Sequence, residues 1–272
     1  MRAMLRLSFL ICACLMVNSI SASGQHRMVS IGDRRLSIDC DGRRASPTTV
    51  VLMAGGGRTR TDWAKVQTSV SSFARVCSYD RAGLGDSDKA SDEQSVEEIV
   101  DDLHALLEKA GEKPPFLLVA HSMAGFHARR FSTKYLSETA GLVFVDSSHE
   151  EQALRLHELD PQGPPPDEAI SRFGFYVKPG QRLEWRTRLP LIVIRHGKPF
   201  PRTARDGSDS QTNRMTEEQW AAWDRIWRGF QEDLAKRSTQ GQLRLAEQSG
   251  HMIPLDQPEV IVQAIRDLSR TQ

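Results

Sequence analysis

The sequence predicts an α/β fold with a mostly parallel central sheet and flanking helices. Two observations lead to this prediction. Short runs rich in β-branched and aliphatic residues alternate with stretches whose apolar residues recur at helical spacing. The alternation begins at residue 27, is interrupted by a longer segment over 149–189 and resumes to residue 268, with no internal repeat and no dividing linker. Chains with this pattern form a sheet covered by helices. We therefore predict a single domain over 25–272, preceded by a separate segment over 1–24.

The β-rich runs predict strands at 27–31, 36–40, 48–53, 75–79, 116–120, 142–145, 191–194 and 243–246. Helical spacing predicts helices at 63–73, 96–110, 123–135, 217–236 and 258–268. The second helix has the clearest start, because Ser95 is followed three residues later by Glu98, as in a capping box. Gly111 is expected to end this helix.

Composition indicates a globular enzyme-sized domain. The chain has 272 residues, of which 39% are hydrophobic, and this is enough to bury one substantial core. Lys and Arg number 36 against 35 Asp and Glu, a formal net charge of +1. This balance does not indicate a nucleic-acid or membrane-surface partner. The sequence does not determine an oligomeric state.

The first 24 residues have the three-part layout of a signal peptide. Arg2 and Arg6 form a basic start, the run 7–17 is apolar, and 18–24 is small and polar. The apolar run is shorter than the ~18 residues of a membrane span. We predict export to the periplasm or the medium, with a lipoprotein-type processing site at Cys14 as the alternative.

Ser122 follows an apolar strand and precedes a helix. A sharp turn at this point would expose its hydroxyl and place the backbone N–H of Met123 at the helix N-terminus, where it can stabilise negative charge. A serine alcohol also needs a neighbouring base and an orienting acid to act as a nucleophile. The alternative is an ordinary helix N-cap.

Four segments resemble motifs of the α/β-hydrolase family and occur in the family's order. Residues 120–125 (AHSMAG) resemble the nucleophile elbow, whose usual form is Gly-x-Ser-x-Gly. Residues 51–57 (VLMAGGG) resemble the oxyanion-loop segment, and 79–87 (YDRAGLGDS) resemble the loop after the fourth strand. Residues 249–258 (SGHMIPLDQP) resemble the segment that carries the catalytic histidine. The resemblance covers the chain from about residue 28 onward and implies an α/β-hydrolase fold with a cap insertion.

The resemblance implies an exported serine hydrolase with Ser122 as nucleophile and His251 as general base. By analogy the backbone N–H groups of Gly56 and Met123 form the oxyanion hole, although a neighbour of Gly56 in the glycine run could equally serve. The implied substrate is a small ester-like molecule, and the implied chemistry needs no metal or organic cofactor. The alternatives are C–C bond hydrolysis, peptide cleavage or acyl transfer, and a catalytically silent binding protein on the same scaffold.

The sequence departs from the family pattern in two places. Ala120 and Ala124 replace the two elbow glycines, which we interpret as a tolerated variant. Ala54 replaces the histidine that often precedes the oxyanion-loop glycine. Because the oxyanion hole uses backbone N–H groups, this change need not abolish function.

The acid of the triad is harder to assign. The family usually places it after the strand at 191–194, but no carboxylate follows there until Asp206. Some members place it one strand earlier, where Asp146 stands. We predict Asp146, with Asp206 as the alternative. His149 and His196 also end strands and are candidates to line the pocket.

Removal of the leader leaves two cysteines, Cys40 and Cys77. They either pair in an oxidising compartment or remain separate buried thiols. The family resemblance places the fourth strand beside the second and so implies a Cys40–Cys77 disulfide.

Residues 149–189 form an insertion where family members build a cap over the pocket. Its aromatic residues are candidates for the pocket, with core packing as the alternative: Phe173, Phe175, Tyr176 and Trp185. The tryptophans of the 217–236 helix are expected to serve helix packing instead: Trp220, Trp223 and Trp227.

Overall fold

The computed structural model describes residues 25–44, 47–90, 94–163, 165, 185–200 and 215–270. The predicted signal peptide lies outside these residues. So do Asp206 and much of the predicted cap, including Phe173, Phe175 and Tyr176. No helix in the described ranges is long and apolar enough to cross a membrane.

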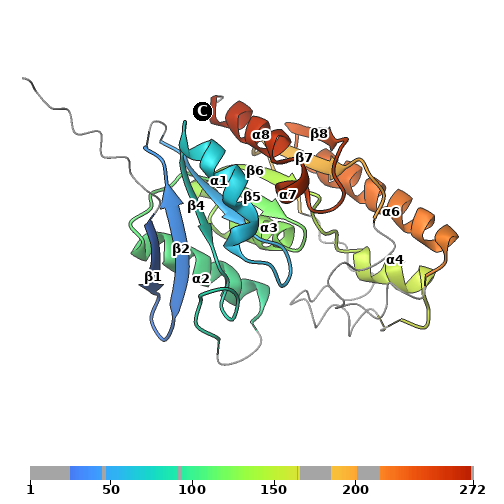
Figure 1. Ribbon diagram of the computed structural model, residues 1–272, viewed down its shortest axis with the longest axis horizontal. Helices are drawn as coiled ribbons and strands as arrows, with labels where there is room; N and C mark the ends of the chain where they lie inside the picture. The colour runs from blue at the N-terminus through green and yellow to red at the C-terminus, as the bar shows by residue number, and fades with distance from the viewer. Residues whose placement is uncertain are drawn as a thin grey trace, which may run out of the picture.

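An eight-stranded sheet forms the centre of the molecule, in the order β1-β2-β4-β3-β5-β6-β7-β8 (Figure 1). The strands are β1 Gln25–Ser30, β2 Arg35–Asp41, β3 Thr49–Met53, β4 Arg75–Tyr79, β5 Phe116–His121, β6 Thr139–Val145, β7 Leu191–His196 and β8 Gly241–Ala246. The pairs β1/β2 and β2/β4 are antiparallel, and every other pair is parallel. The predicted mostly parallel α/β fold is confirmed.

Helices cover both faces of the sheet. The main helices are α1 Ala64–Ser71, α2 Val96–Lys109, α3 Ala124–Lys134, α4 Gln152–Leu159, α6 Glu217–Lys236, α7 Ile253–Asp256 and α8 Pro258–Arg270. One core contains buried residues of α2 and α3, such as Leu103 and Phe131, and also Leu234 of α6. The opposite core contains Val66 of α1 and Ile265 of α8. The strands between these two cores are apolar on both faces, as buried parallel strands are.

The start of α2 matches the sequence prediction. The backbone N–H of Glu98 donates to Ser95 Oγ at 3.3 Å, and the N–H of Ser95 donates to Glu98 Oε2 at 2.8 Å. Thr216 and Gln219 form a second capping box at the start of α6. These reciprocal bonds satisfy backbone donors that the first helical turn leaves free.

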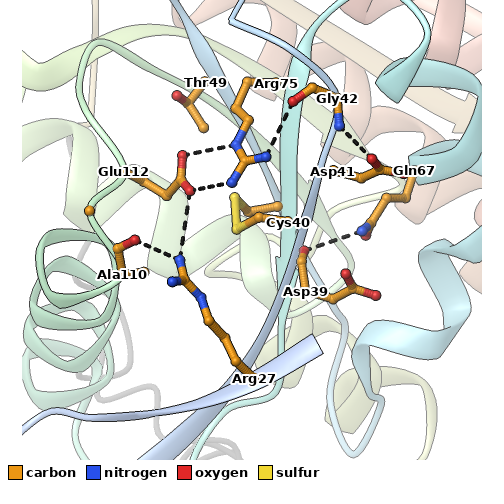
Figure 2. Close-up of a disulfide and its surroundings, with 12 residues drawn as sticks. Arg27, Asp39, Cys40, Asp41, Gly42, Thr49, Gln67, Arg75, Ala110 and Glu112 are labelled. Atoms are coloured by element: carbon orange, nitrogen blue, oxygen red, sulfur yellow. Dashed lines mark hydrogen bonds and ion pairs between the residues drawn. A yellow bond between two sulfur atoms is a disulfide. The ribbon is translucent and has the colours of Figure 1, made fainter. Parts of the chain in front are cut away.

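The disulfide joins Cys40 of β2 to Cys77 of β4, which face each other in the antiparallel register with their Cα atoms 4.1 Å apart (Figure 2). The predicted pairing is therefore present. Glu112 lies beside it, and its ligand atoms and the two sulfurs are within 4.8 Å of one another. The sulfurs are bonded to each other, and the carboxylate accepts hydrogen bonds from Arg75 and Arg44 at 2.7 and 3.0 Å. This group therefore has no ligand free for a metal.

Several tryptophans that follow β6 in the sequence have packing roles in the structure. Trp185 packs against the α2/α3 core, where its ring centroid lies 5.6 Å from that of Phe144. The core-packing alternative therefore applies to Trp185. Trp223 and Trp227 are buried in an aromatic cluster with Phe230, which agrees with the expected packing role.

Candidate active site

Ser122 occupies a sharp turn between β5 and α3. Its φ is +52°, in the left-handed region that non-glycine residues rarely adopt. Such strain is retained where surrounding packing imposes it, often at functional sites. The neighbouring Ala120 and Ala124 are fully buried, so the alanines that replace the elbow glycines fit the packed structure.

Gly125 provides the close approach that an elbow requires. A Cβ at this position would lie 2.7 Å from Ser147 Cβ and 2.8 Å from Ser147 Oγ. The Ser147 hydroxyl itself donates to the carbonyl of Ala120 at 2.8 Å. Gly125 thus lets α3 pack against the segment that follows β6, where Asp146 lies.

The Gly55–Gly57 run lies against the elbow. A Cβ at Gly55 would be 3.2 Å from Ser122 Cβ, and one at Gly56 would be 3.4 Å from Met123 Sδ. Within the described chain, neither the backbone N–H of Gly56 nor that of Met123 has a hydrogen-bond acceptor. Two free donors beside one hydroxyl can bind an oxyanion.

Buried Arg81 holds this loop. Its guanidinium donates to the carbonyl oxygens of Ala54 and of Gly55, the latter at 2.6 Å. A planar guanidinium can bond two acceptors in one fixed orientation. Arg81 comes from the motif that follows β4, and the sequence reasoning assigned it no role.

His251 follows β8, and its Nδ1 lies 2.7 Å from Oδ2 of Asp146. The carboxylate is fully buried, whereas the histidine side chain is 24% exposed. A carboxylate can only accept, so Nδ1 carries the proton and Nε2 of the neutral ring is free to act as a base. No hydrogen bond joins His251 to Ser122 among the described residues. The structure thus brings together the predicted base and one of the two candidate acids.

Asp146 also has a strained backbone and several hydrogen-bond partners. Its φ is +47°. The backbone N–H of His196 donates to Oδ1 at 3.1 Å, and Nδ1 of His196 lies 2.8 Å from Oδ2. Burial alone would raise the pKa of Asp146, but the hydrogen bonds from His196 and His251 outweigh it and lower the pKa. Asp146 is therefore ionised at neutral pH.

His196 is fully buried and lies between two carboxylates. Its second nitrogen, Nε2, is 3.0 Å from Oδ1 of Asp224 on α6. Burial opposes its charged form, yet the hydrogen bonds and charges of Asp146 and Asp224 raise the pKa of His196. His196 therefore does not line a pocket as expected; it is buried between Asp146 and Asp224. No pattern in the sequence indicated Asp224 as its partner.

His121 connects the elbow to the histidine loop. Its Nε2 lies 2.9 Å from the carbonyl oxygen of His251, and a carbonyl accepts only from a protonated nitrogen. Burial, followed by the charge of His251, lowers the pKa of His121 to about 3. His121 is therefore a neutral donor that fixes the backbone of the His251 loop.

Aromatic side chains lie beside His251. The ring centroids of Phe200 and Trp227 are each 5.6 Å from that of the imidazole. Trp227 therefore combines the predicted packing role with a contact to the predicted base.

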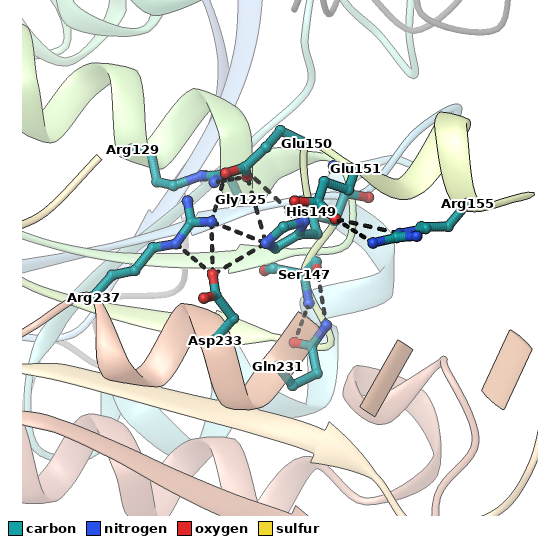
Figure 3. Close-up of polar contacts among 11 residues, drawn as sticks. Gly125, Arg129, Ser147, His149, Glu150, Glu151, Arg155, Gln231, Asp233 and Arg237 are labelled. Carbon is teal, nitrogen blue, oxygen red and sulfur yellow. Dashed lines mark hydrogen bonds and ion pairs between the residues drawn. The ribbon is translucent and has the colours of Figure 1, made fainter. Parts of the chain in front are cut away.

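A buried polar network fixes the segment after Asp146 to α3 and α6 (Figure 3). Glu150 pairs with Arg129 of α3 at 2.8 Å and with Arg237 at 2.5 Å. Nε2 of His149 lies 3.2 Å from a carboxylate oxygen of Asp233. His149 is only 4% exposed, so it belongs to this network and does not line a pocket as expected.

The chain belongs to the alpha/beta hydrolase family, whose sequence pattern it matches over residues 50–264. It is 24% identical over 234 residues to the uncharacterized protein YqjL of Bacillus subtilis, covering 82% of this chain and 84% of that one. A match to the probable transporter efuK of Hormonema carpetanum is 33% identical over 141 residues and covers 50% of this chain. This chain spans only 20% of that protein's length. The solved structure of the carboxylesterase CesB (YbfK) from Bacillus subtilis has a TM-score of 0.62 at 13% identity, over 92% of this chain and 93% of that one, which shows a common fold.

Proposed function

We propose that the protein is a serine hydrolase that cleaves a carboxylic ester or related acyl substrate through Ser122, His251 and Asp146. The observation that carries this proposal is the 2.7 Å contact between His251 Nδ1 and the buried carboxylate of Asp146. It provides an oriented base in a chain whose serine occupies a strained elbow. Membership of a hydrolase family supports the same conclusion.

In the proposed mechanism, Nε2 of His251 takes the hydroxyl proton of Ser122 as Oγ attacks the carbonyl carbon. Catalytic hydrogen bonds are often long before substrate binds, and we expect the Ser122–His251 bond to form in the complex. The N–H groups of Gly56 and Met123 donate to the oxyanion. His251 then protonates the leaving alcohol, and water attacks the acyl-enzyme to release the acid. Asp146 holds the His251 tautomer and stabilises the imidazolium.

The surroundings of His251 favour a substrate with an apolar group. The ring of Phe200 lies beside the base and is half-buried, so part of its surface is accessible, whereas Trp227 behind it is buried. Burying apolar substrate surface there contributes about 25 cal/mol per Å². We therefore expect activity to increase with the size of an apolar acyl or alcohol group until the site is filled.

We also propose that the protein is exported. The leader predicted from the sequence and the Cys40–Cys77 disulfide both support this, because structural disulfides persist in oxidising compartments. Mass analysis of the non-reduced protein, isolated from the periplasm or medium, tests the proposal. An intact leader or two free thiols would contradict it.

Hydrolysis of p-nitrophenyl esters of increasing acyl length, by the protein and by Ser122→Ala, tests the proposed function. We expect turnover by the protein, loss of turnover in the variant, and covalent labelling of Ser122 by a fluorophosphonate probe. Labelling without ester turnover would point to peptide, C–C bond or acyl-transfer substrates. Absence of both would leave a binding protein as the function.

A further inference from the structure

His196 contacts one of the three proposed catalytic residues and has no part in the proposed mechanism. The family usually places its acid directly after β7, and in this chain that place belongs to His196, the last residue of the strand. The ring does not face solvent; its side chain has no exposed surface. It spans from Asp146, directly after β6, to Asp224 on α6, at 2.8 and 3.0 Å.

These distances restrict the protonation of the ring. Each nitrogen faces a carboxylate oxygen, and an ionised carboxylate only accepts hydrogen bonds. A neutral imidazole would leave one nitrogen lone pair against a carboxylate oxygen in a buried site, which is costly. A doubly protonated ring donates to both. With a doubly protonated His196, the three side chains of Asp146, His196 and Asp224 together carry a net charge of −1. With a neutral His196 and two ionised carboxylates, they would carry −2.

We propose that His196 is a doubly protonated positioning residue, which holds Asp146 in place and offsets part of the negative charge that Asp146 presents to His251. Oδ2 of Asp146 accepts from both histidines, at 2.7 Å from His251 and 2.8 Å from His196. A cation at His196 therefore disfavours a second proton on His251. This inference rests on the proposed role of His251.

The other charged groups around His196 are few in the described structure. Arg228 pairs with the second oxygen of Asp224 at 2.5 Å. Arg195 donates to the backbone carbonyl of His196 at 3.2 Å. The ring of Phe200 covers the imidazole at a centroid distance of 4.7 Å and adds no charge. Asp146 and Asp224 are thus the groups that set the state of the ring.

The first test is ¹⁵N NMR of histidine-labelled, oxidised protein between pH 5 and 8. It needs no substitution and no activity. We expect both ring nitrogens of His196 to carry protons throughout. A ring with one protonated nitrogen at pH 7 would overturn the proposal. The NMR spectrum of Ser122→Ala reports the protonation of His196 whether or not Ser122 is the nucleophile. A failure of the proposed function can therefore be distinguished from a failure of this proposal.

The second test is the pH profile of kcat/KM for ester hydrolysis. His196→Asn keeps a neutral donor toward Asp146 but removes the positive charge, and we expect the acid limb of the profile to move up by about one pH unit. Asp224→Asn removes a negative charge and should move the limb down. His149→Asn is the matched control, because His149 is also buried and bound to a carboxylate of α6, at Asp233, outside the Asp146 site. Superimposable profiles for His196→Asn and the control would show a structural role only and overturn the proposal.

Discussion

Asp146 and His251 lie 105 positions apart in the sequence, yet a single 2.7 Å hydrogen bond joins the carboxylate of one to the imidazole of the other. Asp146 directly follows β6 and His251 follows β8, with β7 between the two strands. Because the three strands are parallel, their carboxyl ends meet at one edge of the sheet. The turns there bring together groups that the chain supplies far apart.

Asp146→Asn tests the proposed acid. An amide can donate to Nδ1 and so favours the wrong tautomer of His251, and we expect kcat to fall on the order of 10³- to 10⁴-fold. Asp224 does not contact His251, so Asp224→Asn should lower kcat much less. Steady-state kinetics on one ester substrate gives both numbers. If Asp146→Asn retained the full rate, the triad acid would be a different carboxylate, and Asp206 would be the first to test.

Arg81→Lys tests the support of the oxyanion loop. Lysine cannot bond the carbonyls of Ala54 and Gly55 in the fork geometry of a guanidinium. The loop should loosen, and we expect kcat to fall about tenfold to hundredfold with a smaller change in KM. Arg35→Lys, at an exposed pair with Asp88, is the control. Equal kcat and KM values for the two variants would show that Arg81 does not support the oxyanion loop.

Gly125→Ala tests the packing of the elbow. The added methyl would meet Ser147 at 2.7 Å, so we expect the free energy of unfolding to drop by about 1–3 kcal/mol. Gly229→Ala is the matched control within α6, where a Cβ meets nothing within 4 Å. That substitution should raise stability by about 0.5–1 kcal/mol through helix propensity. Urea unfolding measures both, and a drop for both variants would argue against the specific contact.

Buried histidines predict an acid-sensitive fold. The pKa of His121 is lowered to about 3, mainly by burial, whereas the unfolded chain binds that proton near pH 6.5. Stability from this group is therefore present above pH 6.5 and is lost as pH falls, at about 1.4 kcal/mol per pH unit. His121→Asn should flatten the decline between pH 6 and 4. An unchanged slope in chemical unfolding would contradict the neutral state of His121.

The contribution of His196 to the free energy of unfolding changes with pH in the opposite direction. Its pKa is raised in the folded protein, so its contribution to stability is fully present below pH 6.5 and is lost as pH rises through the raised value. In the same unfolding series, His196→Asn should therefore show less loss of stability than the unsubstituted protein on the alkaline side of pH 6.5.

Most of the architecture could be predicted from local pattern. The central parallel strands β3, β5, β6 and β7 are largely apolar runs five to seven residues long, and α2 begins at a capping box that four residues define. Ser122 and His251 were recognisable because each lies in a short motif at the end of a strand. The acid was ambiguous, because a carboxylate at a strand end has no local feature that distinguishes a partner of histidine from a surface residue.

The sequence by itself determined the α/β class, the turn at Ser122 and the loop that carries His251, since these depend on periodicity and on contacts between near neighbours. Only the tertiary structure decided that Asp146 meets His251, that His196 lies between Asp146 and Asp224, and that Arg81 binds the loop beside Ser122. The physical reason is distance along the chain. These contacts span from 26 to 105 positions, and side-chain chemistry alone does not select one partner among many until the sheet order places the strand ends together.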